Sequence, residues 1–437
     1  GRVRYLSEMP ASQPGAVVLL ATAVSSLHVG VFSRASGRDE SVSRVPTLRC
    51  EAPSPDDWRE FRQRLVSGGI KLTGDNDGGD AVTADVDEPE SDARSVVAPA
   101  NEELLKKQNE ALWMEYLEGA WAHESPCPEP GGLVCRLPLA LQLTRELRQS
   151  SGSLWSEKLR EKLKAELPAD TAEKVENADG ETAAPPVAAA PIGTLKGTLT
   201  YKLAEALVQD CLQAVSAKAS GGRVDINSIS DEQREMVTLY SEAQDSWQEV
   251  ALVLKVSERE GGSIAQDCVV INRPIAKSMN YELASLLLNG APDAQTGIPK
   301  YDEGFVQRFL RAFGDEAAVY VGGPDDQGSG GRCVHGMEVP GAVEVAKGTR
   351  IFTGGVEAIV DAVLEGRMQA LDVRWFVGRR TDVSTADGKW CPVACARPLA
   401  LKQCLGLPKP LWHEVLETAG GELGALSDIE ILKRPDL

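Results

Sequence analysis

The stretch from Cys268 to Gly355 decides the fold of this chain. It contains short β-rich runs that end in turn residues, and these read CVVINRP (268–274), VYVGGPDDQ (319–327), CVHG (333–336) and IFTGG (351–355). Glycine reaches positive φ and proline blocks further ladder pairing, so such endings are typical of strands that stop at tight turns. The repeated Gly-Gly after an apolar run indicates a sharp reversal or a close approach of two backbones. We therefore expect a compact, β-centred module here.

Further strands and helices are expected on both sides of this stretch. Strand patterns cover 247–258 and 372–380, and 131–143 reads as a strand that leaves a Gly-Gly turn. Apolar residues recur at helical spacing over 154–167, 199–217, 231–244, 281–290, 305–314 and 356–366. The C-terminal region predicts an apolar segment broken by proline and then a final helix. This mixture of strands and helices predicts an α+β fold.

Composition limits the classes of function. A chain of 437 residues favours two domains, or one domain with tails, and 42% hydrophobic residues are enough for a real core. The formal net charge is −19 at pH 7, which argues against direct binding of DNA or RNA, because contacts with phosphates need a basic surface. Acidic membrane surfaces are disfavoured for the same reason.

The cysteines favour a reducing compartment. There are nine, an odd number, and several stand inside apolar runs such as LVCRL and DCVVI. In a chain of this length, that pattern is more typical of buried, reduced thiols than of a disulfide framework.

The N-terminal part resembles a two-part targeting leader. An apolar run over 16–32 follows Arg2 and Arg4, and a Ser/Arg-rich segment covers 33–44. This order matches the address used in algae with secondary plastids, so a leader over 1–45 and a plastid location are expected, without stable membrane insertion after processing. The alternative is that the apolar run is a buried strand or helix of the fold.

Helices and linkers are expected between this leader and the β-centred module. Residues 46–100 predict a short helix over 56–66 and an acidic disordered linker over 76–95. Residues 101–130 predict an aromatic-rich helix whose apolar side chains share one broad face: Leu104, Leu105, Leu112, Trp113, Tyr116, Leu117 and Trp121. The region over about 144–244 is expected to be helical and partly disordered, as an insertion or an accessory layer.

Six short motifs in the second half of the chain resemble the AlgH family. In order they read VALVLKVSEREGG (250–262), VINRP (270–274), YVGGP (320–324), VHG (334–336), FTGG (352–355) and DVRWFVG (372–378). The resemblance implies a strongly bent mixed β-sheet that approaches a barrel, with flanking helices packed outside. It places an AlgH-like domain at 131–437, with the insertion inside it.

The chain departs from the family pattern after its FVG motif. Bacterial members continue with Gly-Trp-Gly-Pro-Gly-Gln-Leu, whereas this chain reads RRTDVSTADGKW (379–390). The later ARPLALKQC and LPKPLWHEVLETAGGE look like the tail of algal members. The family has no agreed biochemical activity and is often labelled as transcriptional regulators, so the resemblance implies a fold more firmly than a function.

One group of residues is a candidate site for a small anion. A guanidinium holds a carboxylate or phosphate through its planar fork, and backbone N–H groups at Gly-Gly turns can cradle an anion. The candidate ligand-binding residues are Asn272, Arg273, Pro274, Gly322, Gly323, His335, Gly354 and Gly355. The alternative is structural: Asn272 and Arg273 cap a turn and bridge backbone carbonyls at a strand end.

No catalytic, metal or cofactor site is predicted. Cys333 and His335 stand two residues apart, as a Cys–His nucleophile pair would on one face of a strand, but no oxyanion donors accompany them. The series Cys391, Cys395, Cys404 and His413 has a first gap compatible with zinc, while its later spacing fits no common site. There is no HExxH, GxGxxG or P-loop motif.

These features predict a non-enzymatic, AlgH-like protein that acts through protein contacts or as a small-ligand sensor in an organelle. The first alternative is an anion- or metabolite-binding module, or an enzyme, with its site at Arg273 and the Gly-Gly turns. A second alternative, transcriptional regulation, follows from the family label alone, and direct DNA binding conflicts with the charge. The oligomeric state stays open.

Overall fold

The computed structural model describes residues 16–17, 99–149, 153–166, 190–219, 224–258, 264–291, 299–385, 387–407 and 409–433. The expected leader over 1–45, apart from residues 16–17, lies outside them, as do the short helix over 56–66 and the acidic linker over 76–95. Residues 94–437 belong to one compact unit.

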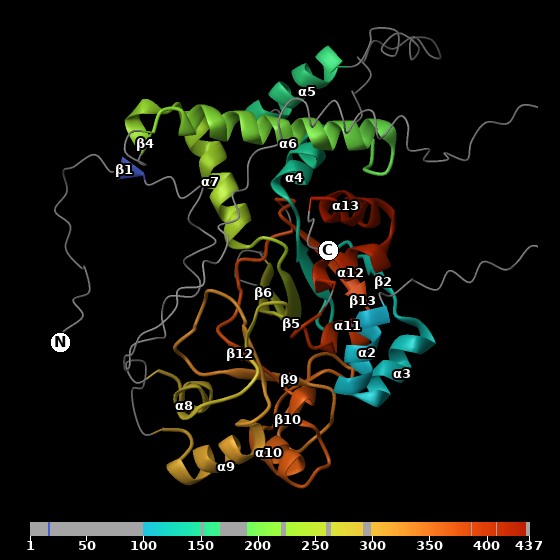
Figure 1. Ribbon diagram of the computed structural model, residues 1–437, viewed down its shortest axis with the longest axis vertical. Coiled ribbons are helices and arrows are strands. Elements are labelled where there is room, and N and C mark those ends of the chain that lie inside the picture. Colours follow the sequence, from blue (N-terminus) through green and yellow to red (C-terminus); the bar gives the residue numbers. More distant parts are fainter. Residues whose placement is uncertain are drawn as a thin grey trace, which may run out of the picture. The chain divides into compact units, whose positions relative to one another are not determined.

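Helices and strands both build the described chain, and the predicted α+β class is confirmed (Figure 1). The helices are α2 (Pro99–Gln108), α3 (Glu110–Gly119), α4 (Leu139–Arg148), α5 (Leu154–Glu166), α6 (Leu195–Ser216), α7 (Asp231–Asp245), α8 (Tyr281–Asn289), α9 (Glu303–Phe313), α10 (Val356–Leu364), α11 (Arg397–Leu401), α12 (Leu411–Ala419) and α13 (Gly421–Ile431). The strands are β1 (Ala16–Val17), β2 (Ala122–Glu124), β3 (Leu133–Arg136), β4 (Val224–Asp225), β5 (Val250–Glu258), β6 (Ile264–Val270), β7 (Pro274–Ala276), β8 (Ala318–Val321), β9 (Arg332–His335), β10 (Ala342–Glu344), β11 (Phe352–Gly354), β12 (Arg374–Val377) and β13 (Trp390–Cys395).

The strands of the module lie in two sheets. A five-stranded antiparallel sheet has the order β2-β13-β3-β5-β6. A six-stranded sheet has the order β10-β11-β9-β12-β8-β7 and is mixed, because β12 runs parallel to β8. The strands that the resemblance placed in one bent sheet are thus divided between two, and neither sheet closes into a barrel within the described residues.

Backbone hydrogen bonds join the two sheets where β6 leads into β7. Val270 N donates to Gly322 O over 2.8 Å, and Cys268 and Arg380 exchange two bonds of 3.1 and 2.9 Å. The connection 271–273 therefore lies at the boundary between the sheets.

Alternating side chains separate two layers of core on the five-stranded sheet, because successive residues of a strand point to opposite faces. One face joins the largest hydrophobic cluster through Leu133, Cys135, Leu252, Val269, Cys391 and Val393. The other face forms a smaller cluster of Val134, Ala251, Val253, Cys268, Val270, Val383 and Trp390.

Helices α8, α9 and α10 pack on one face of the six-stranded sheet (Figure 1). Phe309 and Phe313 of α9 meet the edge of the Trp375 ring on β12, with centroid distances of 4.8 and 5.2 Å. Such T-shaped contacts add to the free energy gained by burying apolar area.

In the sequence, the helices α4 to α7 lie between β3 and β5, two strands that are neighbours in the folded sheet. β3 pairs with β5, and Cys135 lies opposite Val250. α4, α5 and α6 pack on one another, and α7 packs on α6 and α4. Ser230 caps the start of α7 and forms a capping box with Gln233.

The aromatic-rich segment differs from the sequence prediction in two ways. It forms two helices, because Asn109 has extended backbone and caps α3 by accepting a hydrogen bond from Leu112 N. Leu117 and Trp121, expected on the buried face, are 47% and 50% exposed, whereas Leu112 and Tyr116 are buried. The break at Asn109 resets the register of the apolar stripe, so a single helical face was the wrong description.

Two further predictions need correction. Within 131–143 only Leu133–Arg136 is a strand, because Pro138 starts helix α4. The single final helix is in fact two, α12 and α13, which are separated at Gly420.

Among the described residues, no helix has the length and the apolar character that a membrane span requires.

Candidate functional site

Asn272, the first of the predicted site residues, holds the backbone that leads into β5. Its Oδ1 accepts a hydrogen bond of 3.0 Å from Val250 N, and its Nδ2 donates one of 2.8 Å to Gln248 O. Both of its polar atoms therefore serve the backbone of a neighbouring strand end.

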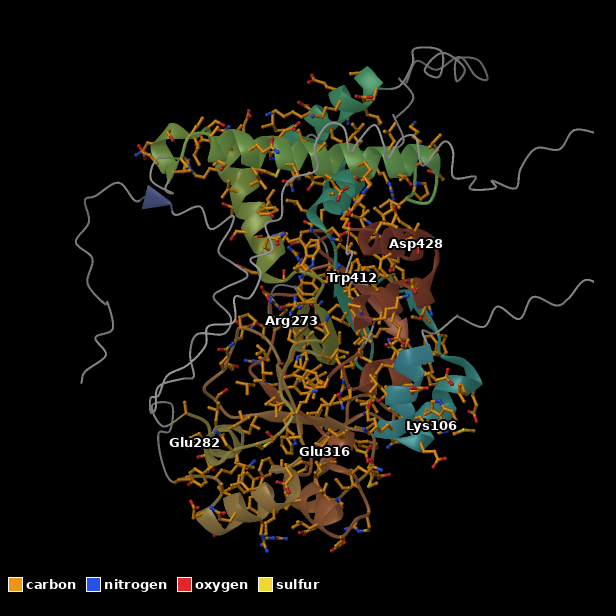
Figure 2. All side chains as sticks on the ribbon, viewed as in Figure 1. Lys106, Arg273, Glu282, Glu316, Trp412 and Asp428 are labelled. Carbon is orange, nitrogen blue, oxygen red and sulfur yellow. The ribbon has the colours of Figure 1, made fainter. Side chains whose placement is uncertain are left out.

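Arg273 lies beside Asn272 in the connection between the sheets and is labelled in Figure 2. Its guanidinium donates to Trp247 O, and its Nε lies 3.9 Å from Glu249 Oε1. Pro274 begins β7 and pairs with Tyr320 of β8. The contacts of Asn272 and Arg273 are those of the structural alternative, in which the two side chains bridge backbone groups at a strand end.

Gly322 and Gly323 follow β8 and lie against the backbone that follows β12. Gly322 N donates to Val377 O over 2.7 Å, so this N–H belongs to the sheet. A Cβ on Gly322 would lie 2.4 Å from Gly378 O, and one on Gly323 would lie 2.2 Å from Arg379 O. The close approach of two backbones, inferred from the repeated glycines, is present at this turn.

His335 and Gly354 contact each other at the other Gly-Gly turn. His335 is buried, and its Nε2 donates to Gly354 O over 3.2 Å. The Cys333 thiol donates to the same carbonyl over 3.5 Å. Gly355 follows directly and starts helix α10.

Cys333 and His335 are both neutral in this environment. Burial raises the pKa of the Cys333 thiol to about 11 and lowers the pKa of His335 below its ordinary value of 6.5. A nucleophilic pair needs a thiolate beside an imidazolium, and here both side chains donate to one carbonyl instead.

The predicted site residues form two separate groups. Gly322 follows Val321, which lies opposite Val377 at the end of β12, while His335 follows Val334, which lies opposite Arg374 at its start. Gly354 ends β11, and β9 and β12 lie between β11 and β8 in the sheet, so at about 4.8 Å per strand the two Gly-Gly turns are roughly 14 Å apart across the sheet. Asn272, Arg273 and Pro274 belong with the Gly322 turn, because Val321 N donates to Arg273 O.

The candidate zinc residues have other partners. His413 Nδ1 lies 2.9 Å from Ser427 Oγ, and its Nε2 lies 3.4 Å from Gln248 Nε2. In the described part of the chain, no three His, Cys, Asp or Glu side chains are placed to hold a metal ion.

A group of charged residues around Glu249 was not found from the sequence. Glu249 is buried, and its Oε2 lies 2.8 Å from Arg380 Nη2. The guanidinium carbons of Arg136 and Arg380 lie 5.6 and 5.4 Å from the centroid of the Trp390 ring. We call Glu249, Arg136, Arg273, Arg380 and Trp390 the Glu249 cluster.

Burial dominates the electrostatics of this cluster. It raises the pKa of Glu249, although Arg380 and Arg273 act in the opposite direction, and it lowers the pKa values of Arg136 and Arg273. Guanidinium groups in such a place can bind carboxylates or phosphates through paired hydrogen bonds.

The cluster could not be read from local patterns, because its members come from segments far apart in the chain. The one sequence signal was the departure from the family pattern over 379–390, which supplies both Arg380 and Trp390.

Comparisons with known proteins add no functional assignment. No protein-family model matches the chain, and no curated protein matches it. A crystal structure of a protein from Corynebacterium diphtheriae, determined by the Northeast Structural Genomics Consortium, is similar over 41% of this chain and 81% of its own. The sequence identity is 16% and the TM-score is 0.27.

Proposed function

We propose that this chain is a non-enzymatic, AlgH-like interaction module that binds a protein partner through an exposed apolar surface of α3 and the segment after it. The observation that carries the proposal is the exposure of Met114, Leu117 and Trp121, at 46%, 47% and 50%. The family assignment and the plastid location rest on the sequence motifs and on the N-terminal composition.

The three side chains form what we call the α3 surface. Met114 and Leu117 are three residues apart in one helix and so point to the same side. Trp121 follows the helix and stacks on His123, with ring centroids 5.3 Å apart. Trp and Met are enriched at protein interfaces, and Trp is a frequent hot spot.

The opposite side of α3 is fixed to the rest of the unit. Tyr116 OH donates to the buried Glu414 over 2.6 Å, and Asn109 Nδ2 donates to Asp372 over 2.7 Å. Lys106 of α2, labelled in Figure 2, lies 4.4 Å from the centroid of the Trp113 ring. A fixed helix loses little conformational entropy on binding, which favours a role in recognition.

The charge of α3 indicates the chemistry of the partner. The helix contains Glu110, Glu115 and Glu118 and no Lys or Arg. Glu115 is paired with Arg397, while Glu110 and Glu118 are exposed. The expected partner is therefore a protein segment with apolar anchors flanked by basic residues.

A co-purification experiment tests this proposal. The full chain is used as bait in an extract of the organism that makes it, beside the variant Met114→Ser/Leu117→Ser and the control Val343→Ser, whose side chain is 67% exposed on β10. We expect a partner whose recovery falls about tenfold or more with the double variant and is unchanged with the control. Equal recovery with all three baits would overturn the proposal.

No specific observation favours either transcriptional regulation or an anion site at the residues predicted from the sequence. An anion site built from Arg273 together with both Gly-Gly turns needs groups that follow β8 and β11, and two strands, β12 and β9, separate these in the sheet. Transcriptional regulation keeps only the family label as its support, and the net charge of −19 disfavours direct DNA binding.

A further inference from the structure

Arg136 is a buried arginine whose side chain forms no hydrogen bond or ion pair within the described residues. The residue is 4% exposed, and its Nε is enclosed without a hydrogen-bond partner. Its guanidinium carbon lies 5.6 Å from the centroid of the Trp390 ring, and the carboxylates of Asp387, Glu242 and Glu249 act on it electrostatically without pairing with it. Burying a charge without a partner costs free energy, so this arrangement needs an explanation.

The other buried arginines of the described chain have polar partners for their terminal nitrogens, although Arg380 Nε, like Arg136 Nε, has no hydrogen-bond partner. Arg374 donates to the carbonyls of Ala400 and Lys402, and Arg380 pairs with Glu249 and Asp382. Arg136 therefore differs from them in its partners and not in its burial.

The backbone of Arg136 is held firmly. Its N–H donates to Glu249 O over 2.8 Å. Its carbonyl accepts a hydrogen bond of 2.9 Å from Nε1 of Trp412, which is labelled in Figure 2. Trp390 lies directly opposite Arg136 in the β3–β13 pair. The backbone that carries the guanidinium is therefore fixed opposite the backbone of Trp390.

The carboxylates around Arg136 are paired with other cations. Glu242 and Asp387 lie 2.7 and 3.8 Å from Lys389, and Glu249 lies beside Arg380 and Arg273. The side chains of Lys389, Asp387 and Glu242 are 27%, 41% and 48% exposed, so this edge of the cluster reaches solvent.

We propose that Arg136 is the main contact of a binding site for a small, singly charged oxyanion, either a carboxylate or a phosphate. The guanidinium offers paired donors to two oxygen atoms, while Trp390 fixes its plane. Formal charges in the surroundings balance, with Arg136, Arg273, Arg380 and Lys389 against Glu242, Glu249, Asp382 and Asp387. Binding therefore depends on directed hydrogen bonds, and the nearby carboxylates disfavour a second negative charge on the ligand.

This site falls where the chain departs from the family that it resembles. Arg380, Asp382, Asp387, Lys389 and Trp390 all belong to the segment 379–390, which replaces the Gly/Trp segment of the bacterial members. The site shares no residue with the α3 surface, so a failure of the partner proposal leaves it unaffected.

Thermal unfolding of the full chain with acetate, inorganic phosphate or sulfate tests the site, at constant chloride concentration. A ligand that binds the folded state raises the melting temperature by mass action. We expect acetate, phosphate or both to raise the melting temperature of the wild type, and sulfate to have a weaker effect. In titrations, Arg136→Met should increase the dissociation constant about tenfold or more.

The same variant has a second, independent readout. Without anion, Arg136→Met should melt at or above the wild-type temperature, because a buried charge without a partner is replaced by an apolar side chain. The control Arg308→Met removes an exposed arginine that pairs with Asp361 and should keep the anion response.

Four results would overturn the proposal. The first is that no anion raises the melting temperature of the wild type. The second is that Arg136→Met keeps the anion response, and the third is that Arg136→Met melts below the wild-type temperature or fails to fold. In the fourth, Arg273→Met alone abolishes the response, and the anion then binds at the Gly322 turn.

Discussion

Burial decides what individual polar side chains can do in this protein. Lys402 and Glu414 form a buried ion pair, and Glu414 also accepts from Tyr116 OH and Asn101 Nδ2. Burial, with the nearby carboxylates, raises the pKa of Tyr116 further above its ordinary value, so this hydroxyl stays protonated. A network with this many partners is stable and specific rather than reactive.

The buried His335 should make the stability of the protein depend on pH. Burial lowers the pKa of His335 in the folded state below 6.5, so below that pH the unfolded chain binds a proton that the folded chain rejects. The free energy of unfolding should therefore fall as pH drops from 6.5 toward the folded-state pKa, by at most about 1.4 kcal/mol per pH unit.

Urea unfolding of the wild type and of His335→Gln, between about pH 7.5 and about pH 5.5, measures this contribution. The variant should be less stable at both ends, but its stability should depend less on pH. Equal slopes for the two proteins would show that His335 does not titrate as its burial predicts.

At the scale of elements, the turn after β8 and the turn after β12 support each other. Asp325 and Arg379 exchange backbone hydrogen bonds of 2.9 and 2.8 Å. The Asp325 carboxylate also accepts from Thr381 N and Thr381 Oγ1, over 3.0 and 2.6 Å. These contacts form an antiparallel bridge just beyond the last ladder residues of the parallel pair of β8 and β12.

Gly323→Ala should break this contact between turns. Gly323 has φ of +148°, and a Cβ there would lie 2.2 Å from the Arg379 carbonyl oxygen. Strain and overpacking together should cost about 3 kcal/mol or more. Gly366→Ala is the matched control, because Gly366 also has positive φ, at +73°, but has open space around it. It should cost only about 1–2 kcal/mol. Chemical unfolding compares the two, and a similar loss in both would disprove the close approach.

At the scale of the whole molecule, the segment over 99–124 packs and pairs with the C-terminal elements β13, α11 and α12. β2 pairs with β13, and α3 contacts α11. Asn101 of α2 donates to Glu414 of α12 over 3.0 Å. The aromatic-rich segment therefore completes the core around the C-terminal helices.

Two fragments test this dependence. The fragment 94–437 should unfold cooperatively. The fragment 131–437 should lose at least about 3 kcal/mol, because Glu414 then lacks Tyr116 and Asn101 and β13 lacks β2. Circular dichroism during heating and limited proteolysis compare the two. If both melt at the same temperature, residue 131 marks the start of an independent domain, as the resemblance implied.

The sequence by itself determined the elements whose signals are local. Helical spacing and caps located α5 to α10, and Gly or Pro endings located β8, β11 and β12, because such patterns act within a few residues. The close backbone approach at Gly322 and Gly323 was also readable.

Only the tertiary structure decided the features that depend on distant partners. β13 contains Pro392, and a proline argues against a strand because it has no N–H to donate. On the β2 side, Pro392 faces Ser125, whose N–H donates to Pro392 O, but β2 has already ended at Glu124. The missing N–H of Pro392 therefore costs no hydrogen bond of the β2–β13 ladder. The exposure of Trp121, the separation of the two Gly-Gly turns and the Glu249 cluster likewise follow from chain segments that meet only on folding. Periodicity shows which side chains share one face of a helix or strand. Whether that face is buried, and which charges surround it, depends on the chain segments that pack against it.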